Sequence, residues 1–163
     1  MKLGIIIVFN NNQDDIKTKT IIDQLKSTDQ IEFCLVDNES KDDTLELLRE
    51  IKENCSSVSI VEIKKHVSIV ASKRAGARYM FNNFDLRHLA CLDVNTLKSY
   101  RLNLSDIIEL ICTETESIIS YDRDLKSKYI IKPTLFKSVF SLMDYLKKIQ
   151  GKEVSRGLNL IIV

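Results

Sequence analysis

The chain has 163 residues, of which 44% are hydrophobic and 29% are charged, and its formal net charge is +1. This length fits a single domain, 1–163, and the composition is that of a folded globular chain rather than a disordered one. The near-neutral charge gives no overall field that would recruit nucleic acid or an anionic membrane. Only 4 glycines and 1 proline are present, which argues against an all-β protein with many tight turns.

The four cysteines form no Cys-x-x-Cys pair, so we expect neither a zinc ribbon nor a thioredoxin-type site. Cys34 and Cys91 lie in apolar runs and are expected to be buried thiols. The apolar run at the start is too short for a signal-peptide core, and no run reaches the roughly 20 residues of a membrane span. We therefore expect no transmembrane segment and a reduced, cytoplasmic protein.

Strand-length apolar runs alternate with helical periodicity up to residue 92. We expect strands at 3–9, 31–36, 58–63 and 88–92. Helices are expected between them, the first capped by Asp14 or Asp15, the second by Ser40, Asp42 or Asp43, and the third spanning 69–81. This βαβαβαβ order predicts an α/β fold with a mainly parallel central sheet flanked by helices.

The remaining residues are less regular. We expect a helix from Ser105, as its cap, through Cys112, strands at 116–121 and 129–132, a helix at 134–149 and a last strand at 159–163. No repeat or linker marks a second domain.

Polar side chains follow three of the predicted strands, at the edge where open parallel sheets bind ligands. These segments are Phe9-Asn10-Asn11-Asn12, Asp37-Asn38-Glu39-Ser40 and Asp93-Val94-Asn95. The first turn lacks glycine, which argues against the Gly-rich phosphate loop of a Rossmann or P-loop protein. Amide and carboxylate groups suit a base or ribose together with a hard cation, Mg²⁺ or Mn²⁺, held by oxygen ligands.

These segments resemble those of family 2 glycosyltransferases, which have the GT-A fold. Residues 35–45 look like that family's Val-Asp-Asp/Asn-x-Ser-x-Asp-x-Thr segment. Phe9-Asn10-Asn11 falls where the family has Thr-Tyr-Asn, 71–76 where it has Ala-Ala-Arg-Asn-Ala-Gly, and Asp93-Val94-Asn95 at its Asp-x-Asp. The resemblance covers 1–97, which we expect to be the nucleotide-sugar-binding half, with 98–163 an abbreviated second half.

The resemblance implies a nucleotide-sugar donor, specifically a UDP-sugar, and an unknown saccharide, lipid or protein acceptor. The implied donor-binding residues are Phe9, Asn10, Asn11, Asp37, Asn38, Arg74 and Asp93. Asp37 would accept a hydrogen bond from the base, while Asp93 and Asn95 would hold Mn²⁺ or Mg²⁺ on the diphosphate. Asn95 replaces an acid of the family motif, and Arg74 stands where the family usually has Asn.

The catalytic base is not assigned, although Asp122, Asp124, Asp144 and Glu153 are candidates. His66 and His88 lack metal-ligand spacing and are expected to be structural or surface residues. The sequence is compatible with a homo-oligomer.

Two other functions stay open at this point. Residues 92–95 resemble the phospho-acceptor strand end of receiver domains, and 129–133 resemble their Lys-Pro strand end, which would indicate a signalling domain. A GT-A relative that only binds its ligand is the second alternative, because a fold does not fix a function.

Overall fold

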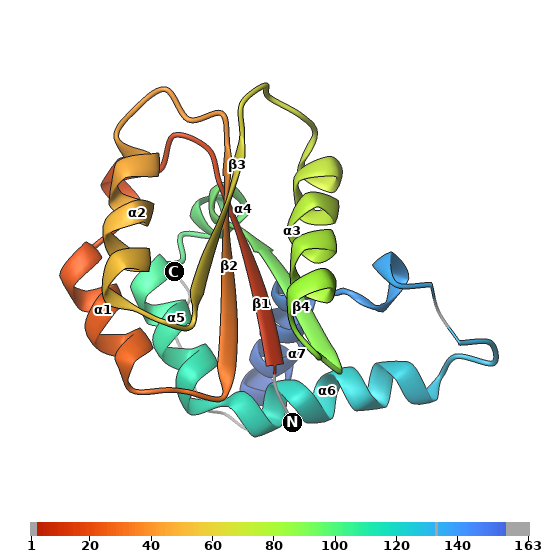
Figure 1. Ribbon diagram of the computed structural model, residues 1–163. Helices are drawn as coiled ribbons and strands as arrows, with labels where there is room; N and C mark the ends of the chain where they lie inside the picture. Colours follow the sequence, from red (N-terminus) through yellow and green to blue (C-terminus); the bar gives the residue numbers. More distant parts are fainter. Residues whose placement is uncertain (1–2, 133, 156–163) are drawn as a thin grey trace.

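The computed structural model describes residues 3–132 and 134–155, and within these ranges five strands form one sheet (Figure 1). The strands are β1 (Leu3–Phe9), β2 (Ile31–Asn38), β3 (Val58–Ile63), β4 (His88–Asp93) and β5 (Phe140–Ser141). Their order is β3-β2-β1-β4-β5, and every neighbouring pair in it is parallel. The first four are the strands predicted from the apolar runs, and the predicted α/β fold is confirmed.

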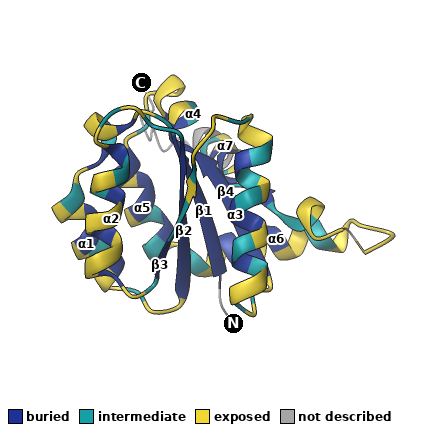
Figure 2. Ribbon diagram, turned by 45° about the horizontal axis from the view of Figure 1, so that its top comes forward, coloured by how far each residue is buried: buried dark blue, intermediate teal, exposed yellow. Residues whose placement is uncertain are grey.

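The central strand β1 is buried along its whole length. Its side chains alternate between two cores, with Ile5 and Ile7 entering one and Ile6 and Val8 entering the other. A strand buried on both faces needs apolar residues at every position, which explains the uninterrupted run in the sequence. Figure 2 shows β1, β2 and β4 as a buried layer between helices whose outer faces are exposed, whereas β3 is partly exposed.

Helices cover both faces of the sheet. The larger core lies under α1 (Thr18–Lys26), α2 (Thr44–Asn54), α5 (Leu104–Thr113), α6 (Thr115–Ser127) and α7 (Leu142–Ser155). The smaller core lies under α3 (Ile69–Asn83), and a short helix, α4 (Val94–Ser99), follows β4 directly. Among the helices in the described ranges, none has the length and apolar character needed to cross a bilayer.

The strand register brings three carboxyl ends to the same level. Phe9 pairs with Asp37 across β1 and β2, and Val8 pairs with Asp93 across β1 and β4. The polar turn after β1 therefore lies between the two aspartates, at the edge predicted for ligand binding.

Several elements after residue 97 differ from the prediction. The expected strand at 116–121 belongs to α6, because Ile118, Ile119 and Asp122 share one buried helical face. The expected strand at 129–132 is an exposed loop. The expected helix at 134–149 is divided, with a 3₁₀ turn (η2, Phe136–Ser138) and β5 preceding α7. The last expected strand, 159–163, lies outside the described residues.

Two predicted helix caps are also wrong. Asp14 and Asp15 lie in a 3₁₀ turn (η1, Gln13–Asp15), while α1 begins after Lys17 without a side-chain cap. Asn103 caps α5, its Oδ1 accepting a hydrogen bond from the backbone N–H of Ser105 at 2.8 Å. Ser105 is buried in the first turn of that helix.

Candidate functional site

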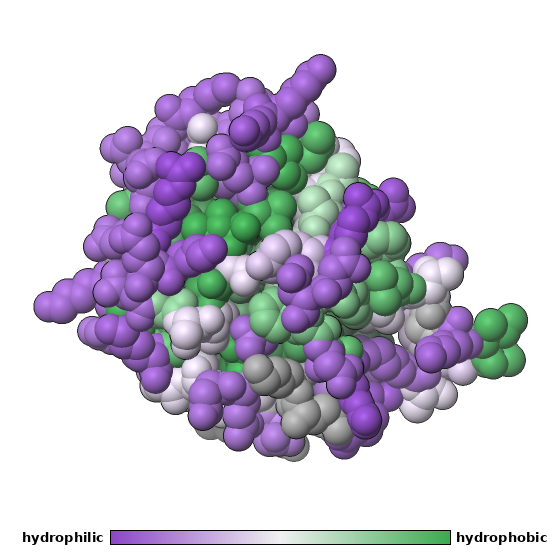
Figure 3. Space-filling view, viewed as in Figure 1, coloured by the Kyte–Doolittle hydropathy of each residue, from purple (hydrophilic) through white to green (hydrophobic). Residues whose placement is uncertain are grey.

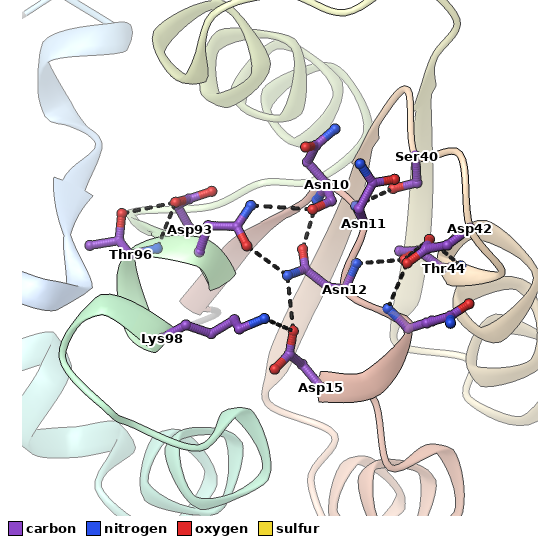
Figure 4. A network of polar contacts seen from close by, with 12 residues as sticks. Asn10, Asn11, Asn12, Asp15, Ser40, Asp42, Thr44, Asp93, Thr96 and Lys98 are labelled. Carbon is purple, nitrogen blue, oxygen red and sulfur yellow. Dashed lines mark hydrogen bonds and ion pairs between the residues drawn. The ribbon is translucent and has the colours of Figure 1, made fainter.

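The turn after β1 is organised around Asn12, whose side chain is fully buried (0% exposed). Its Nδ2 donates to Asp15 Oδ2 at 3.0 Å and to Asn95 Oδ1 at 2.8 Å, and its Oδ1 accepts from the backbone N–H of Asn10 at 2.7 Å. Its backbone N–H donates to Thr44 Oγ1 at 2.7 Å. Asn12 thus joins β1, α2 and α4, and Figure 4 shows these contacts converging on it. The sequence marks the asparagine run but gives no sign that this member is the buried one.

Asn11 links the same turn to the start of α2. Its backbone N–H donates to Ser40 Oγ at 3.0 Å, and its Oδ1 accepts from the backbone N–H of Lys41 at 2.6 Å. Its φ of 54° lies in the left-handed region, which Asn tolerates better than most residues. Asp42 adds a second link by accepting from the backbone N–H groups of Gln13 (3.2 Å) and Thr44 (3.0 Å). Ser40 and Asp42 were candidates for the cap of α2, but its N-cap is Asp43, which makes no side-chain cap hydrogen bond. Ser40 and Asp42 instead bind the β1 turn.

Asp37 and Asn38 are adjacent at the end of β2 but have different roles. The amide of Asn38 binds the β3–α3 loop, because its Nδ2 donates to Val67 O (2.8 Å) and its Oδ1 accepts from Val67 N–H (3.1 Å). Asp37 is only 2% exposed, and its Oδ2 accepts from the backbone N–H of Ser40 at 3.3 Å. Its Oδ1 is buried and has no hydrogen-bond partner among the described residues. An unpaired buried carboxyl oxygen costs about 1–3 kcal/mol or more, so this position favours a ligand that donates a hydrogen bond.

Asp93 and Asn95, the predicted metal ligands, lie at the same edge but differ in what they offer a cation. Asp93 Oδ2 accepts from the backbone N–H (2.9 Å) and the hydroxyl (2.8 Å) of Thr96, whereas its Oδ1 makes no hydrogen bond with any described residue. Asn95 Oδ1 accepts from Asn12, and its Nδ2 donates to Asn10 O at 3.2 Å. Both ends of the Asn95 amide are therefore used in holding the β1 turn. Across residues 3–132 and 134–155, no group of three His, Cys, Asp or Glu side chains is arranged to bind a metal ion.

The other predicted donor-binding residues are placed differently. Asn10 is half-buried, and its Nδ2 donates to Asn38 O at 2.7 Å. Phe9 points into the larger core and is buried, so its backbone rather than its ring lies at the site. Arg74 is exposed on α3, and its guanidinium has no ion-pair partner among the described residues. Lys98 reaches the turn from α4 and pairs with Asp15 Oδ2 at 3.2 Å, a contact that the sequence did not indicate.

The base candidates are scattered. Asp122 is buried at the opposite edge of the sheet, where it pairs with His88 Nδ1 (2.7 Å) and Lys126 Nζ (2.6 Å). His88 is therefore structural, as predicted, and Asp122 is not available at the carboxyl edge. Asp124 is exposed on α6, and the side chain of Glu153 lies outside the described set. Asp144 is exposed in the first turn of α7. The strand before this helix, β5, is parallel to β4 and therefore runs toward the carboxyl edge of the sheet.

A groove of about 710 Å³ between α5, α6 and α7 is lined by residues such as Glu109, Tyr121 and Tyr145. Neither Asp37 nor Asp93 borders it. The donor-site prediction therefore depends on the polar edge of the sheet and not on this groove.

A family model for glycosyl transferase family 2 matches residues 5–149, most of the chain. The chain belongs to glycosyl transferase family 2. Its parallel sheet and flanking helices are those of the GT-A fold that the family resemblance implied. This membership and the loop at 129–132 set the receiver-domain alternative aside, because that alternative requires a strand at 129–132.

Solved structures that resemble this family 2 chain include the mannosyltransferase PcManGT from Pyrobaculum calidifontis in complex with GDP-Man and Mn²⁺. The two are 19% identical, with a TM-score of 0.41, over 48% of this chain and 24% of that one. The match thus spans about a quarter of the mannosyltransferase chain. No curated protein matches this sequence.

Proposed function

We propose that this family 2 protein is a glycosyltransferase that binds a nucleoside-diphosphate sugar at the carboxyl edge of its sheet, between Asp37 and Asp93. The observation that carries the proposal is the unpaired, buried Oδ1 of Asp37 at the end of β2. A base that donates an N–H group to this oxygen would remove the cost of leaving it unpaired. Because the oxygen lies beneath the surface, the side chains over it must turn aside when the base enters.

The number of free acceptor atoms favours uracil as the base. Asp37 Oδ2 already accepts from Ser40, so Oδ1 is the one carboxyl oxygen with no hydrogen-bond partner among the described residues. Uracil presents a single N–H group between two carbonyl groups, whereas guanine presents two adjacent N–H groups that would need both carboxyl oxygens. We therefore propose a UDP-sugar as the donor.

A divalent cation, Mn²⁺ or Mg²⁺, is proposed to enter together with the donor diphosphate. Asp93 fits such an ion because one of its oxygens makes no hydrogen bond in the described part of the chain, and one carboxylate with substrate phosphates is a common magnesium site. Asn95 Oδ1 accepts one hydrogen bond, from Asn12, and its second lone pair would join Asp93 in holding the ion. When bound, the cation would neutralise charge on the diphosphate.

We propose that 1–97 forms the donor-binding half and that 98–163 is an abbreviated second half facing a saccharide, lipid or protein acceptor. Asp144 is the base candidate to test first, because β5 leads the chain toward the donor edge just before it.

The four cysteines are free thiols, which supports a reducing, cytoplasmic location.

Nucleotide titration followed by thermal unfolding tests donor binding. UDP and UDP-sugars should raise the melting temperature in the presence of Mn²⁺, GDP should raise it less, and chelation should reduce the effect. A ligand at a hundred times its Kd stabilises by about 2.7 kcal/mol, which such a measurement resolves easily. Asp37→Asn, which keeps the side-chain volume, should weaken UDP binding at least about tenfold, equivalent to about 1.4 kcal/mol.

The matched control is Asp85→Asn, at an exposed position before β4 on the other edge of the sheet. This variant should bind UDP like the parent protein. A parent chain that no nucleotide stabilises would overturn the proposed function. Equal UDP binding by the Asp37 and Asp85 variants would overturn the assignment of Asp37 while leaving the function standing.

A further inference from the structure

A projecting segment between α6 and β5 exposes apolar side chains. We call residues 128–132 and 134–138 the arm, which extends from the body of the molecule on the right of Figure 1. Ile130 is 101% exposed and Ile131 81%, while Tyr129, Leu135 and Phe136 are also exposed. Apolar side chains gather at the tip of the projection in Figure 3. Two neighbouring isoleucines that are exposed to this extent indicate a site of contact with a protein or a membrane.

The arm is also basic, although the chain as a whole is nearly neutral. Residues 125–143 contain four lysines and no aspartate or glutamate, so the rest of the chain has 20 basic and 23 acidic residues. Lys126 is held by Asp122, but the ammonium groups of Lys128, Lys132 and Lys137 form no ion pair with any described residue. The net charge of +1 therefore hides a local positive segment that coincides with the apolar one.

We propose that the arm inserts into the surface of an anionic lipid bilayer. Isoleucine, tyrosine and phenylalanine side chains enter the boundary between headgroups and acyl chains, and flanking lysines bind the acidic headgroups. The positive charge favours an anionic lipid surface over a second copy of this chain. Two arms packed together would place the three unpaired lysines of one against the three of the other. This inference concerns a surface apart from the donor site and does not depend on the proposed function.

Vesicle flotation without nucleotide tests the proposal directly. The full chain should bind vesicles of phosphatidylcholine mixed with phosphatidylglycerol, bind vesicles of phosphatidylcholine alone much more weakly, and lose affinity as salt is raised. Replacing both exposed isoleucines, Ile130→Ser with Ile131→Ser, should lower the partition coefficient at least about tenfold. Lys128→Gln and Lys132→Gln should each lower it about fivefold on acidic vesicles only.

Two matched controls separate the arm from general surface effects. Ile69→Ser with Val70→Ser removes another exposed pair of neighbouring aliphatic residues, at the start of α3. Lys19→Gln with Lys26→Gln removes two exposed lysines on α1, on the far side of the molecule from the arm (Figure 1). Both controls should bind acidic vesicles like the parent, and the arm variants should keep the UDP-induced rise in melting temperature.

Three results would overturn the proposal. The first is no binding to acidic vesicles by the parent chain, and the second is equal loss of binding in the arm variants and the controls. The third is concentration-dependent self-association that the Ile130→Ser, Ile131→Ser variant abolishes, without vesicle binding, which would assign the arm to a second copy. A positive vesicle result with no nucleotide response would leave the arm standing and overturn only the donor proposal.

Discussion

At the scale of single residues, Asn12 is the clearest test of how the site is held together. Both polar atoms of its side chain are hydrogen-bonded, and its Nδ2 faces Asp15 Oδ2 at 3.0 Å and Asn95 Oδ1 at 2.8 Å. Asn12→Asp keeps the size but replaces a donor by an acceptor that faces two oxygens. We expect the free energy of unfolding to fall by about 2–4 kcal/mol, measured by urea denaturation.

The control for this change is Asn82→Asp, at an exposed position on α3. Its effect should stay within about 0.5 kcal/mol, as for most surface substitutions. Similar small effects at both positions would show that Asn12 does not hold the β1 turn.

The sequence predicted the candidate site through Asp37 and Asp93, because both follow apolar runs of strand length. It could not separate the roles of neighbouring amides. Asn38 and Asn95 bind backbone or side-chain groups of other segments, and which way each side chain points depends on loop conformation. The left-handed φ of Asn11 is one such conformation, and several residue types at that position would fit the sequence pattern equally well.

At the scale of elements, two helical glycines should respond oppositely to the same substitution. A Cβ on Gly76 of α3 would lie 2.8 Å from Ile6 Cγ2 and 3.0 Å from Val36 Cγ2, so the helix packs on the sheet through this position. We expect Gly76→Ala to destabilise the protein by about 1–3 kcal/mol despite the better helix propensity of alanine.

Gly151 of α7 provides the comparison, because a Cβ there meets nothing within 4 Å. Gly151→Ala should raise stability by up to about 1 kcal/mol through helix propensity alone. Both variants are measured by urea denaturation. Stabilisation by both would mean that α3 does not need the close approach at Gly76.

Element prediction succeeded where the apolar pattern has one interpretation and failed where it has two. The runs that form β1 and β2 place apolar residues on both faces of the chain, which fits a buried strand and not a surface helix. The pair Ile118-Ile119 looks like part of a strand, yet in α6 it forms a buried helical face with Asp122. Residues 129–132 have strand composition, but a strand forms only with a partner, and here the segment is an exposed loop instead.

At the scale of the whole molecule, the parallel direction of the first four strands follows from their alternation with helices, whereas their spatial order and the contacts distant in sequence do not. The buried pair of His88 and Asp122 joins β4 to α6 across 34 residues, and neither local sequence indicates the other. The two-residue strand β5 is likewise too short to leave an apolar signature, so the closing edge of the sheet could not be predicted.

The central sheet should behave as one cooperative unit, which cysteine labelling can test. Cys34 of β2 and Cys91 of β4 both pair with Ile6 of β1, in the core under α3. Burial raises the pKa of the Cys34 thiol to about 12 and also raises the pKa of Cys91. Because the thiolate is the reactive form, neither should react with iodoacetamide at about pH 8 until the sheet unfolds.

The half-buried Cys112 on α5 is the internal reference and should be labelled first, with little dependence on urea. Peptide mass spectrometry should give Cys34 and Cys91 equal rates that follow global unfolding as urea is raised. Faster labelling of Cys91 would mean that β4 opens separately, since only two residues of β5 cover its outer edge. In that case the part of the chain around β4 would not share the stability of β1 and β2, and the prediction that the sheet is one cooperative unit would be wrong.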